Sequence, residues 1–414
     1  MLTTTTVSLV LLFVWGILYV ILRKRLYTSK LYFCLLIIMG SAGLFLHPLP
    51  LMGLFPEEYR LSHILLFSLL MVIMVLPWMK VDQLIKRHPV LCVNNQRIGL
   101  IKTICILLSL LPLYSIIYAL PYALYANSIG AADVRSELLE SSIMPQSVFT
   151  TFAVGFASFS PVIVLLFYIS LLDKRLNRYS LLLFISSMSI LVTNMASAAR
   201  DAFVFIPLMY LCFYFIFRHS LDERVTKRLR RVGLIALLLV VSVLGGITID
   251  RFYSGEEDSS RLIYGTWGYF YQQPYVFDHI LDQTHLFYGF NRRLKFLKGV
   301  FNIGGVEYSI STANQADYMF GTQFAEFYQM AGYKSLFIGS VLFLLVFYLI
   351  LLHHFKRKNY FALLVSFCIY YLFTLSGMFY FRYGGNDSEF LFYSGILLLT
   401  YFIPNILHVD FASS

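Results

Sequence analysis

The side chains that could carry acid–base chemistry are concentrated between residues 250 and 334. Asp278 and Asp282 are four residues apart, and His285 follows Asp282 by three, so on a helix each pair shares one face. A carboxylate or imidazole held beside a hydroxyl group can act as its general base. The candidate catalytic residues are Asp278, His279, Asp282, His285 and Glu326. Any one of them, considered alone, is more often a solvated loop residue.

Arg200 has the chemistry to bind a phosphate, because a guanidinium donates two parallel hydrogen bonds to phosphate oxygens. It lies in the sequence NMASAARD, within an apolar stretch from 180 to 217 that is just long enough for two membrane crossings and a very short turn. A cation at the membrane edge needs a partner. Arg200 is therefore either a phosphate anchor or an interfacial arginine paired with Asp201.

Two further basic segments allow the same chemistry. In NRRLKFLK (291–298), Arg292, Lys295 and Lys298 follow one another at intervals of three and share a helix face, which fits a phosphate site or contact with lipid headgroups. Arg382 follows an apolar run directly, in a segment that could equally be a plain turn. The candidate diphosphate-binding residues are Arg200, Arg292, Arg293, Lys298 and Arg382.

The composition indicates that lipid surrounds the elements that position these groups. Of the 414 residues, 59% are hydrophobic and 13% are charged, whereas a soluble domain has roughly 25% charged residues. The apolar runs are long and do not alternate, which favours helices over a barrel. At about 20 residues per crossing, the sequence predicts an all-α membrane protein with about eleven spans near 6–22, 31–47, 62–79, 102–121, 148–172, 180–198, 202–217, 232–249, 335–352, 360–380 and 390–407.

The charges are sorted between alternate loops, which predicts the orientation of these spans. With the N-terminus outside and the C-terminus in the cytoplasm, 21 of the 32 basic residues fall in cytoplasmic loops and 17 of the 22 acidic residues fall outside. This sorting explains the net charge of +10 without a nucleic-acid partner. The expected organisation is helices one to eight in 1–249, an external loop in 250–334, and helices nine to eleven in 335–414.

The external loop is too rich in aromatic residues to be disordered. It contains YGTWGYFYQQP (264–274) and FAEFY (324–328). We expect short helices that pack on the outer membrane surface, with rings that anchor at the interface or stack on sugars. No CxxC or HExxH spacing occurs, and none of the five cysteines lies in a predicted external loop, so neither a metal, a cofactor nor an external disulfide is expected.

With these features, the sequence resembles the Wzy-type polymerases of O-antigen and capsular polysaccharide. The resemblance covers most of the chain as architecture and depends on ASAARDAF (196–203), on the late Tyr-rich external loop, and on the acidic and aromatic stretch that ends at Gly332. It implies a GT-C-like fold, a substrate linked to undecaprenyl diphosphate, and a phosphate-binding role for Arg200. Arg292 and Arg293 match the second basic loop of some members only loosely.

The resemblance makes polymerisation of lipid-linked repeat units the expected activity, in a bacterial plasma membrane. The expected partners are undecaprenyl-diphosphate-linked oligosaccharides and membrane lipids, with a chain-length regulator protein as a further candidate. Alternatives are an O-antigen ligase, which transfers the glycan to a lipid A core, a flippase for lipid-linked oligosaccharides, and a scaffold without chemistry. Nearly charge-free spans with polar groups gathered at one face favour an enzyme over a transporter.

Overall fold

The computed structural model describes residues 2–45, 58–87, 90–93, 98–129, 144–145, 147–196, 201–252, 271–284, 287, 322–379, 387–402 and 409–411. The chain divides into two compact units, and each unit is assembled from three separate segments. Unit 1 comprises Met1–Gln83, Ile263–Leu352 and Phe373–Leu398, and unit 2 comprises Leu84–Leu262, His353–Leu372 and Leu399–Ser414.

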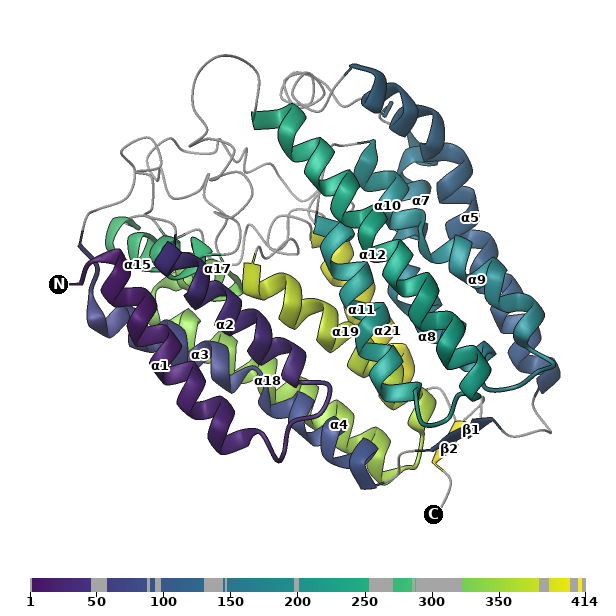
Figure 1. The fold of residues 1–414 in the computed structure, drawn as a ribbon, viewed down its shortest axis with the longest axis horizontal. Helices are drawn as coiled ribbons and strands as arrows, with labels where there is room; N and C mark the ends of the chain where they lie inside the picture. The colour runs from purple at the N-terminus through teal and green to yellow at the C-terminus, as the bar shows by residue number, and fades with distance from the viewer. Residues whose placement is uncertain are drawn as a thin grey trace. The chain divides into compact units, whose positions relative to one another are not determined.

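Unit 1 is a group of apolar helices with two short helices at one end (Figure 1). In it α1 packs on α2 and α3, and the short helix α15 packs on α3 and α17. Its helices are α1 (Thr4–Leu22), α2 (Lys30–Phe45), α3 (Leu61–Ile73), most of α4 (Leu76–Arg87), α15 (Gln273–Gln283), α17 (Gln323–Ala331), α18 (Tyr333–Lys356) and α21 (Asp387–Phe402).

The turn between α1 and α2 is closed by a buried carboxylate from α4. Asp82 accepts hydrogen bonds from the backbone N–H groups of Tyr27 (2.7 Å), Thr28 (2.9 Å) and Ser29 (3.1 Å), and from the hydroxyl groups of Thr28 and Ser29. The N-terminus of a helix has N–H groups without partners in the helix and a positive dipole end. Asp82 therefore caps α2 from a distant part of the sequence, and both of its oxygens are used.

Unit 2 is built around α5 (Ile98–Ile129), which packs against α7 (Val148–Ala157), α9 (Ser180–Ser187) and α10 (Ser189–Met195). On the other side of α9, α8 (Ser160–Ser170) packs against α9 and α11 (Asp201–Phe217). The unit also contains the 3-10 turn η2 (Asn177–Tyr179), the long helix α12 (Glu223–Phe252) and the first part of α19 (Tyr360–Phe379).

The predicted span 148–172 is a bent pair of helices rather than one straight helix. α7 and α8 meet at an angle of 44°. Pro161 occupies the first turn of α8, where its missing N–H costs nothing, so it favours the start of a new helix. The hydroxyl groups of Ser160 and Ser189 are 2.8 Å apart and join the start of α8 to that of α10.

Within the described residues of unit 2, a small two-stranded sheet is added to the expected all-α fold. In unit 2, β1 (Leu91–Val93) pairs antiparallel with β2 (Val409–Phe411), with Cys92 opposite Asp410. The N–H of Leu91 also donates to the hydroxyl of Ser220 at 2.7 Å. Pairing of these strands holds the C-terminal residues 409–411 against the segment that precedes α5.

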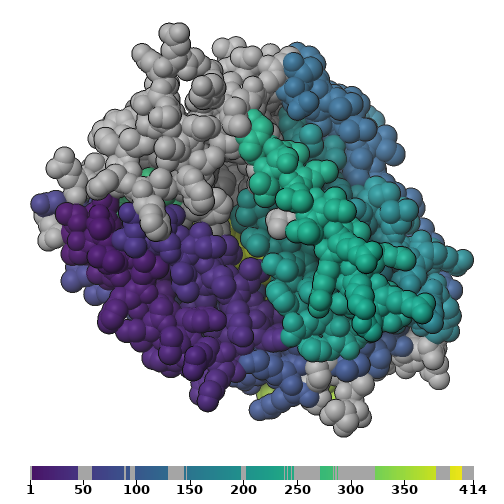
Figure 2. Space-filling model, in the orientation of Figure 1, coloured from purple at the N-terminus to yellow at the C-terminus, as the bar shows by residue number. Residues whose placement is uncertain are grey.

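Length and hydropathy make the chain an α-helical membrane protein. Six helical segments in the described residues are long and apolar enough to cross a membrane, and the bent pair makes up to seven. Large apolar side chains such as Phe13 on α1 and Val341 on α18 are exposed, as expected for lipid-facing positions. Figure 2 shows the surface of α1 and α2, coloured purple, as one continuous area.

Candidate functional site

α15 is held firmly against the ends of two apolar helices of unit 1. The hydroxyl of Tyr275 lies 3.0 Å from that of Ser8 and 3.1 Å from the carbonyl oxygen of Thr4, both on α1. On α3, the ring of Phe67 packs on that of Phe277, with 5.4 Å between centroids. Pro274 lies in the first turn of α15, a favourable position for proline, and Val276, Ile280 and Leu281 bury apolar side chains along the helix. This packing fixes the carboxylates that α15 carries.

A carboxylate–imidazole pair joins α15 to α3. The Nδ1 atom of His63 lies 2.8 Å from Oδ1 of Asp278, and the two side chains are 8% and 1% exposed. The same oxygen accepts a hydrogen bond from the backbone N–H of Arg60 at 3.3 Å. A carboxylate at this distance places the proton of a neutral imidazole on Nδ1, which leaves Nε2 as an acceptor.

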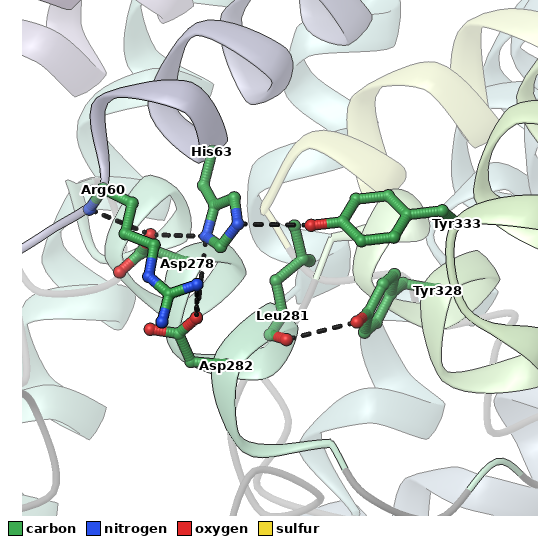
Figure 3. Close-up of polar contacts among 7 residues, drawn as sticks. All are labelled: Arg60, His63, Asp278, Leu281, Asp282, Tyr328 and Tyr333. Carbon is green, nitrogen blue, oxygen red and sulfur yellow. Dashed lines mark hydrogen bonds and ion pairs between the residues drawn. The ribbon is translucent and has the colours of Figure 1, made fainter.

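A phenol completes the chain of polar contacts. The hydroxyl of Tyr333, at the start of α18, lies 3.2 Å from Nε2 of His63. Figure 3 shows Asp278, His63 and Tyr333 in one line, with the imidazole in the middle. With Nδ1 protonated, the Tyr333 O–H donates to Nε2. The three residues thus form a continuous path of hydrogen bonds from a buried carboxylate to the exposed start of α18.

An ion pair lies on the exposed side of this chain. The guanidinium of Arg60 is 3.1 Å from Oδ1 of Asp282, with side-chain exposures of 55% and 24%. That oxygen is also 4.0 Å from Nδ1 of His63. Two carboxylates therefore flank the imidazole, and one guanidinium offsets part of their charge.

The two buried aspartates of unit 1 differ in how their oxygens are used. Every donor around Asp82 is directed at one of its oxygens, as expected for a structural cap. Asp278 takes both of its contacts on Oδ1, and within the described residues Oδ2 has no hydrogen-bond partner. A buried oxygen without a partner costs free energy, and such costs persist mainly at functional sites. Asp278 is therefore the candidate for chemistry, whereas the contacts of Asp82 are those of a structural cap.

Burial around α15 favours the uncharged forms of the ionisable side chains that lie near the hydrogen-bonded residues Asp278, His63 and Tyr333. It lowers the pKa of His279, although Asp278 and Asp282 oppose the shift. It also raises the pKa of Tyr275 to about 12 and that of Tyr271 to about 12. His279 is consequently neutral near pH 7, and both phenols keep their protons.

The corner between α17 and α18 determines where Tyr333 lies. The hydroxyl of Tyr328 donates to the carbonyl oxygen of Leu281 at 3.2 Å, and its ring meets that of Tyr333 edge to face at 5.1 Å. Gly332, between the two helices, has φ +70°, a conformation that a side chain would strain, and a Cβ there would meet the ring of Phe287 at 3.3 Å. The tight corner directs α18 so that Tyr333 reaches His63.

The structure brings together only part of the predicted site. Asp278 and Asp282 lie one helical turn apart on α15, as their spacing predicted, and both approach His63, which the sequence did not predict. His279 is buried on the same helix and Glu326 lies on α17, and within the described residues neither has a hydrogen bond or ion pair with His63. The remaining predicted residues lie outside the described residues: His285, Arg200, Arg292, Arg293, Lys298 and Arg382.

Sequence reasoning missed three members of the site: Arg60, His63 and Tyr333. A signal for His63 was present, because it lies inside the predicted span 62–79 and an ionisable residue within a span is functional by default. Arg60 was also a basic residue on the predicted acidic side. Tyr333 gave no signal among the 30 tyrosines of the chain.

The arrangement is suited to accepting and moving a proton. A carboxylate that orients an imidazole and stabilises its charged form is a recurrent device for general base catalysis. Within the described residues no group of three or more His, Cys, Asp or Glu side chains could hold a metal ion. When the chain is compared with protein-family models, curated proteins and solved structures, none of them matches it.

Proposed function

We propose that the chain is a polysaccharide polymerase of the bacterial plasma membrane. It transfers a glycan from undecaprenyl diphosphate to a sugar hydroxyl of another lipid-linked repeat unit, on the outer face of the membrane. The resemblance to Wzy-type polymerases suggests this reaction. The observation that carries the proposal is the Asp278–His63–Tyr333 chain, because the reaction requires removal of a proton from a hydroxyl group.

The proposed topology has eleven spans, with the N-terminus outside and a GT-C-like arrangement. Six long helical segments and the bent α7–α8 pair support seven of these spans, and the proposal assigns the other four to α2, α11, α12 and α21. In unit 1, His63 lies near the start of α3 and Tyr333 begins α18, and charge sorting predicts both of these helix ends to be outside. The proton-accepting chain then lies on the same side as the predicted substrate.

The proposed reaction needs one base and a stabilised leaving group. The acceptor oxygen bonds to the anomeric carbon of the donor, the bond from that carbon to the diphosphate oxygen breaks, and the electron pair leaves with the lipid diphosphate. The proton of the acceptor hydroxyl ends on His63, whose imidazolium Asp278 stabilises. Cations beside the diphosphate lower the barrier further, a role proposed for Arg200, Arg292, Arg293, Lys298 and Arg382.

The test uses purified protein and a defined lipid-linked repeat unit in single-turnover polymerisation. His63→Gln and Asp278→Asn should each lower the rate of extension by about 100-fold or more. About 100-fold is the lower end of the rate loss expected when a general base, or the carboxylate that orients it, is removed. Asp82→Asn is the matched control, because Asp82 is also a buried aspartate, but its hydrogen bonds go to Tyr27, Thr28 and Ser29 and not to the acid–base residues. Per folded molecule its rate should stay at the wild-type value.

A rate for His63→Gln within a few-fold of wild type would remove the base from the proposal. Supplying lipid A core as the acceptor distinguishes the ligase, which extends that core instead of a second repeat unit. One structural feature favours a second candidate, a flippase: the bent α7–α8 pair, since transporters often bind substrate at discontinuous helices. Movement of labelled lipid-linked oligosaccharide across vesicle membranes, without chain extension, would support the flippase.

A further inference from the structure

His63 has no nitrogen available for direct contact with a substrate. Its Nδ1 is engaged by Asp278 at 2.8 Å, its Nε2 by the hydroxyl of Tyr333 at 3.2 Å, and its side chain is 8% exposed. Tyr333, in contrast, is 44% exposed. A substrate hydroxyl that approaches from the exposed side would therefore meet the phenol before the imidazole.

We infer that the Tyr333 hydroxyl is the catalytic group that contacts the acceptor sugar, and that His63 accepts the proton through it. This inference rests on the proposed polymerase function. As the acceptor oxygen bonds to the anomeric carbon, its proton passes to the phenol oxygen of Tyr333. The phenol proton passes in the same step to Nε2 of His63, so Tyr333 is neutral before and after and His63 ends as the imidazolium.

The charges around His63 support the direction of this transfer. The new imidazolium lies 2.8 Å from Asp278 and 4.0 Å from Asp282, so two carboxylates stabilise it. The backbone N–H of Arg60 and its guanidinium hold these two carboxylates in place. The phenol itself needs no lasting negative charge, because it gives up one proton as it receives another.

Tyr328 provides a matched control for the hydroxyl of Tyr333. The two rings touch, and each hydroxyl has an acceptor at 3.2 Å. Tyr328 donates to a backbone carbonyl, that of Leu281, and is 6% exposed. Figure 3 shows the two phenols side by side with different partners. Removal of the Tyr328 hydroxyl costs a structural hydrogen bond without interrupting the path to His63.

The experiment compares Tyr333→Phe with Tyr328→Phe in single-turnover extension at saturating lipid-linked repeat unit. Tyr333→Phe should lower the extension rate by about 100-fold, as for other acid–base groups, with substrate binding unchanged. Tyr328→Phe keeps the ring that packs on Tyr333 and removes only the bond to Leu281, so its rate per folded molecule should fall by no more than a few-fold. In mixtures of H2O and D2O, the wild-type rate should fall as the D2O fraction rises, along the curve expected when two protons are transferred in the same step. A tyrosine with a purely structural role would not produce that curvature.

A second measurement protects the test against misfolding of Tyr333→Phe. Incorporation of 3-fluorotyrosine at position 333 keeps the ring and the hydroxyl, and it should preserve activity near neutral pH. Only the alkaline limb of the pH–rate profile should move to lower pH, because the fluorinated phenol is a stronger acid and an ionised phenol has no proton to donate to His63. If His63→Gln is inactive while Tyr333→Phe matches Tyr328→Phe, the relay is overturned and the proposed function stands. If His63→Gln is active, the proposed base and the relay are both overturned.

Discussion

Replacement of Asp82 by alanine would leave five donors at the start of α2 without their acceptor. Three of them are backbone N–H groups, of Tyr27, Thr28 and Ser29, which cannot turn toward other partners. A buried donor left without an acceptor costs about 1–3 kcal/mol. Allowing for partial hydration of the cavity, the three amides together predict a loss of about 3–6 kcal/mol in the free energy of unfolding. The two hydroxyl groups can rotate and contribute less.

Asp82→Asn should lower the free energy of unfolding by about 2 kcal/mol, which is less than Asp82→Ala, because one side-chain oxygen remains an acceptor while the new NH2 group faces a backbone donor. Asp173→Asn is the surface control. Asp173 pairs with Arg175, whose side chain is 50% exposed, at 2.8 Å. Ion pairs of this kind contribute about 0–1 kcal/mol. The expected order of stability is therefore Asp173→Asn, then Asp82→Asn, then Asp82→Ala.

The assay is equilibrium unfolding by SDS in mixed micelles, followed by tryptophan fluorescence. Trp78 is a local reporter, because its indole N–H donates to the hydroxyl of Thr28 at 2.7 Å, within the same network. An unfolding free energy for Asp82→Ala within about 1 kcal/mol of wild type would refute the reasoning, since the predicted loss from the amides alone is at least three times larger.

Two further predictions concern pH and topology. Burial lowers the pKa of His279 below its ordinary value of 6.5, so folding favours the neutral ring. The stability that this group contributes is therefore present above pH 6.5. It is lost as the pH falls through 6.5 toward the folded-state pKa, because the unfolded chain then binds a proton that the folded chain does not. His279→Gln should therefore lose less stability than wild type between pH 7 and about 5, measured by the same SDS titration, and equal losses would contradict this. For topology, Ser259→Cys should react with an impermeant thiol reagent on intact cells and Ser414→Cys only after permeabilisation, in a chain whose exposed Cys34 and Cys92 have been replaced. Labelling of both from the same side would exclude the eleven-span arrangement.

The sequence predicted the helices and part of the site, because both depend on local pattern. Long apolar runs have few stable alternatives to a helix in lipid, and six helical segments of the described residues, or seven with the bent pair, are long and apolar enough to cross a membrane. The spacing of Asp278 and Asp282 similarly predicted that they share a face of one helix. The bend after Ala157 was missed, although Pro161 is a signal for the start of a new helix.

Partners far apart in the sequence could not be predicted from it. His63 and Asp278 are separated by 215 residues, and His63 and Tyr333 by 270. No local rule pairs one histidine with one of many carboxylates or phenols. The outcome depends on the tight corner at Gly332 and on the packing of α15 against α1 and α3, which are properties of the folded chain.

The capping of two helices from a distance sets an order of events during synthesis of the chain. The hydrogen bonds that cap α2 cannot form until Asp82 has left the ribosome, more than fifty residues after Thr28. The bond from the Arg60 N–H at the start of α3 to Asp278 forms later still, because Asp278 follows Arg60 by 218 residues. All of 84–262 has been translated before this contact can form. The nascent α2 and α3 must therefore enter the membrane with uncapped ends. A chain stalled before α15 would hold α1, α2 and α3 without Tyr275 and Asp278, the residues through which α15 bonds to α1 and α3.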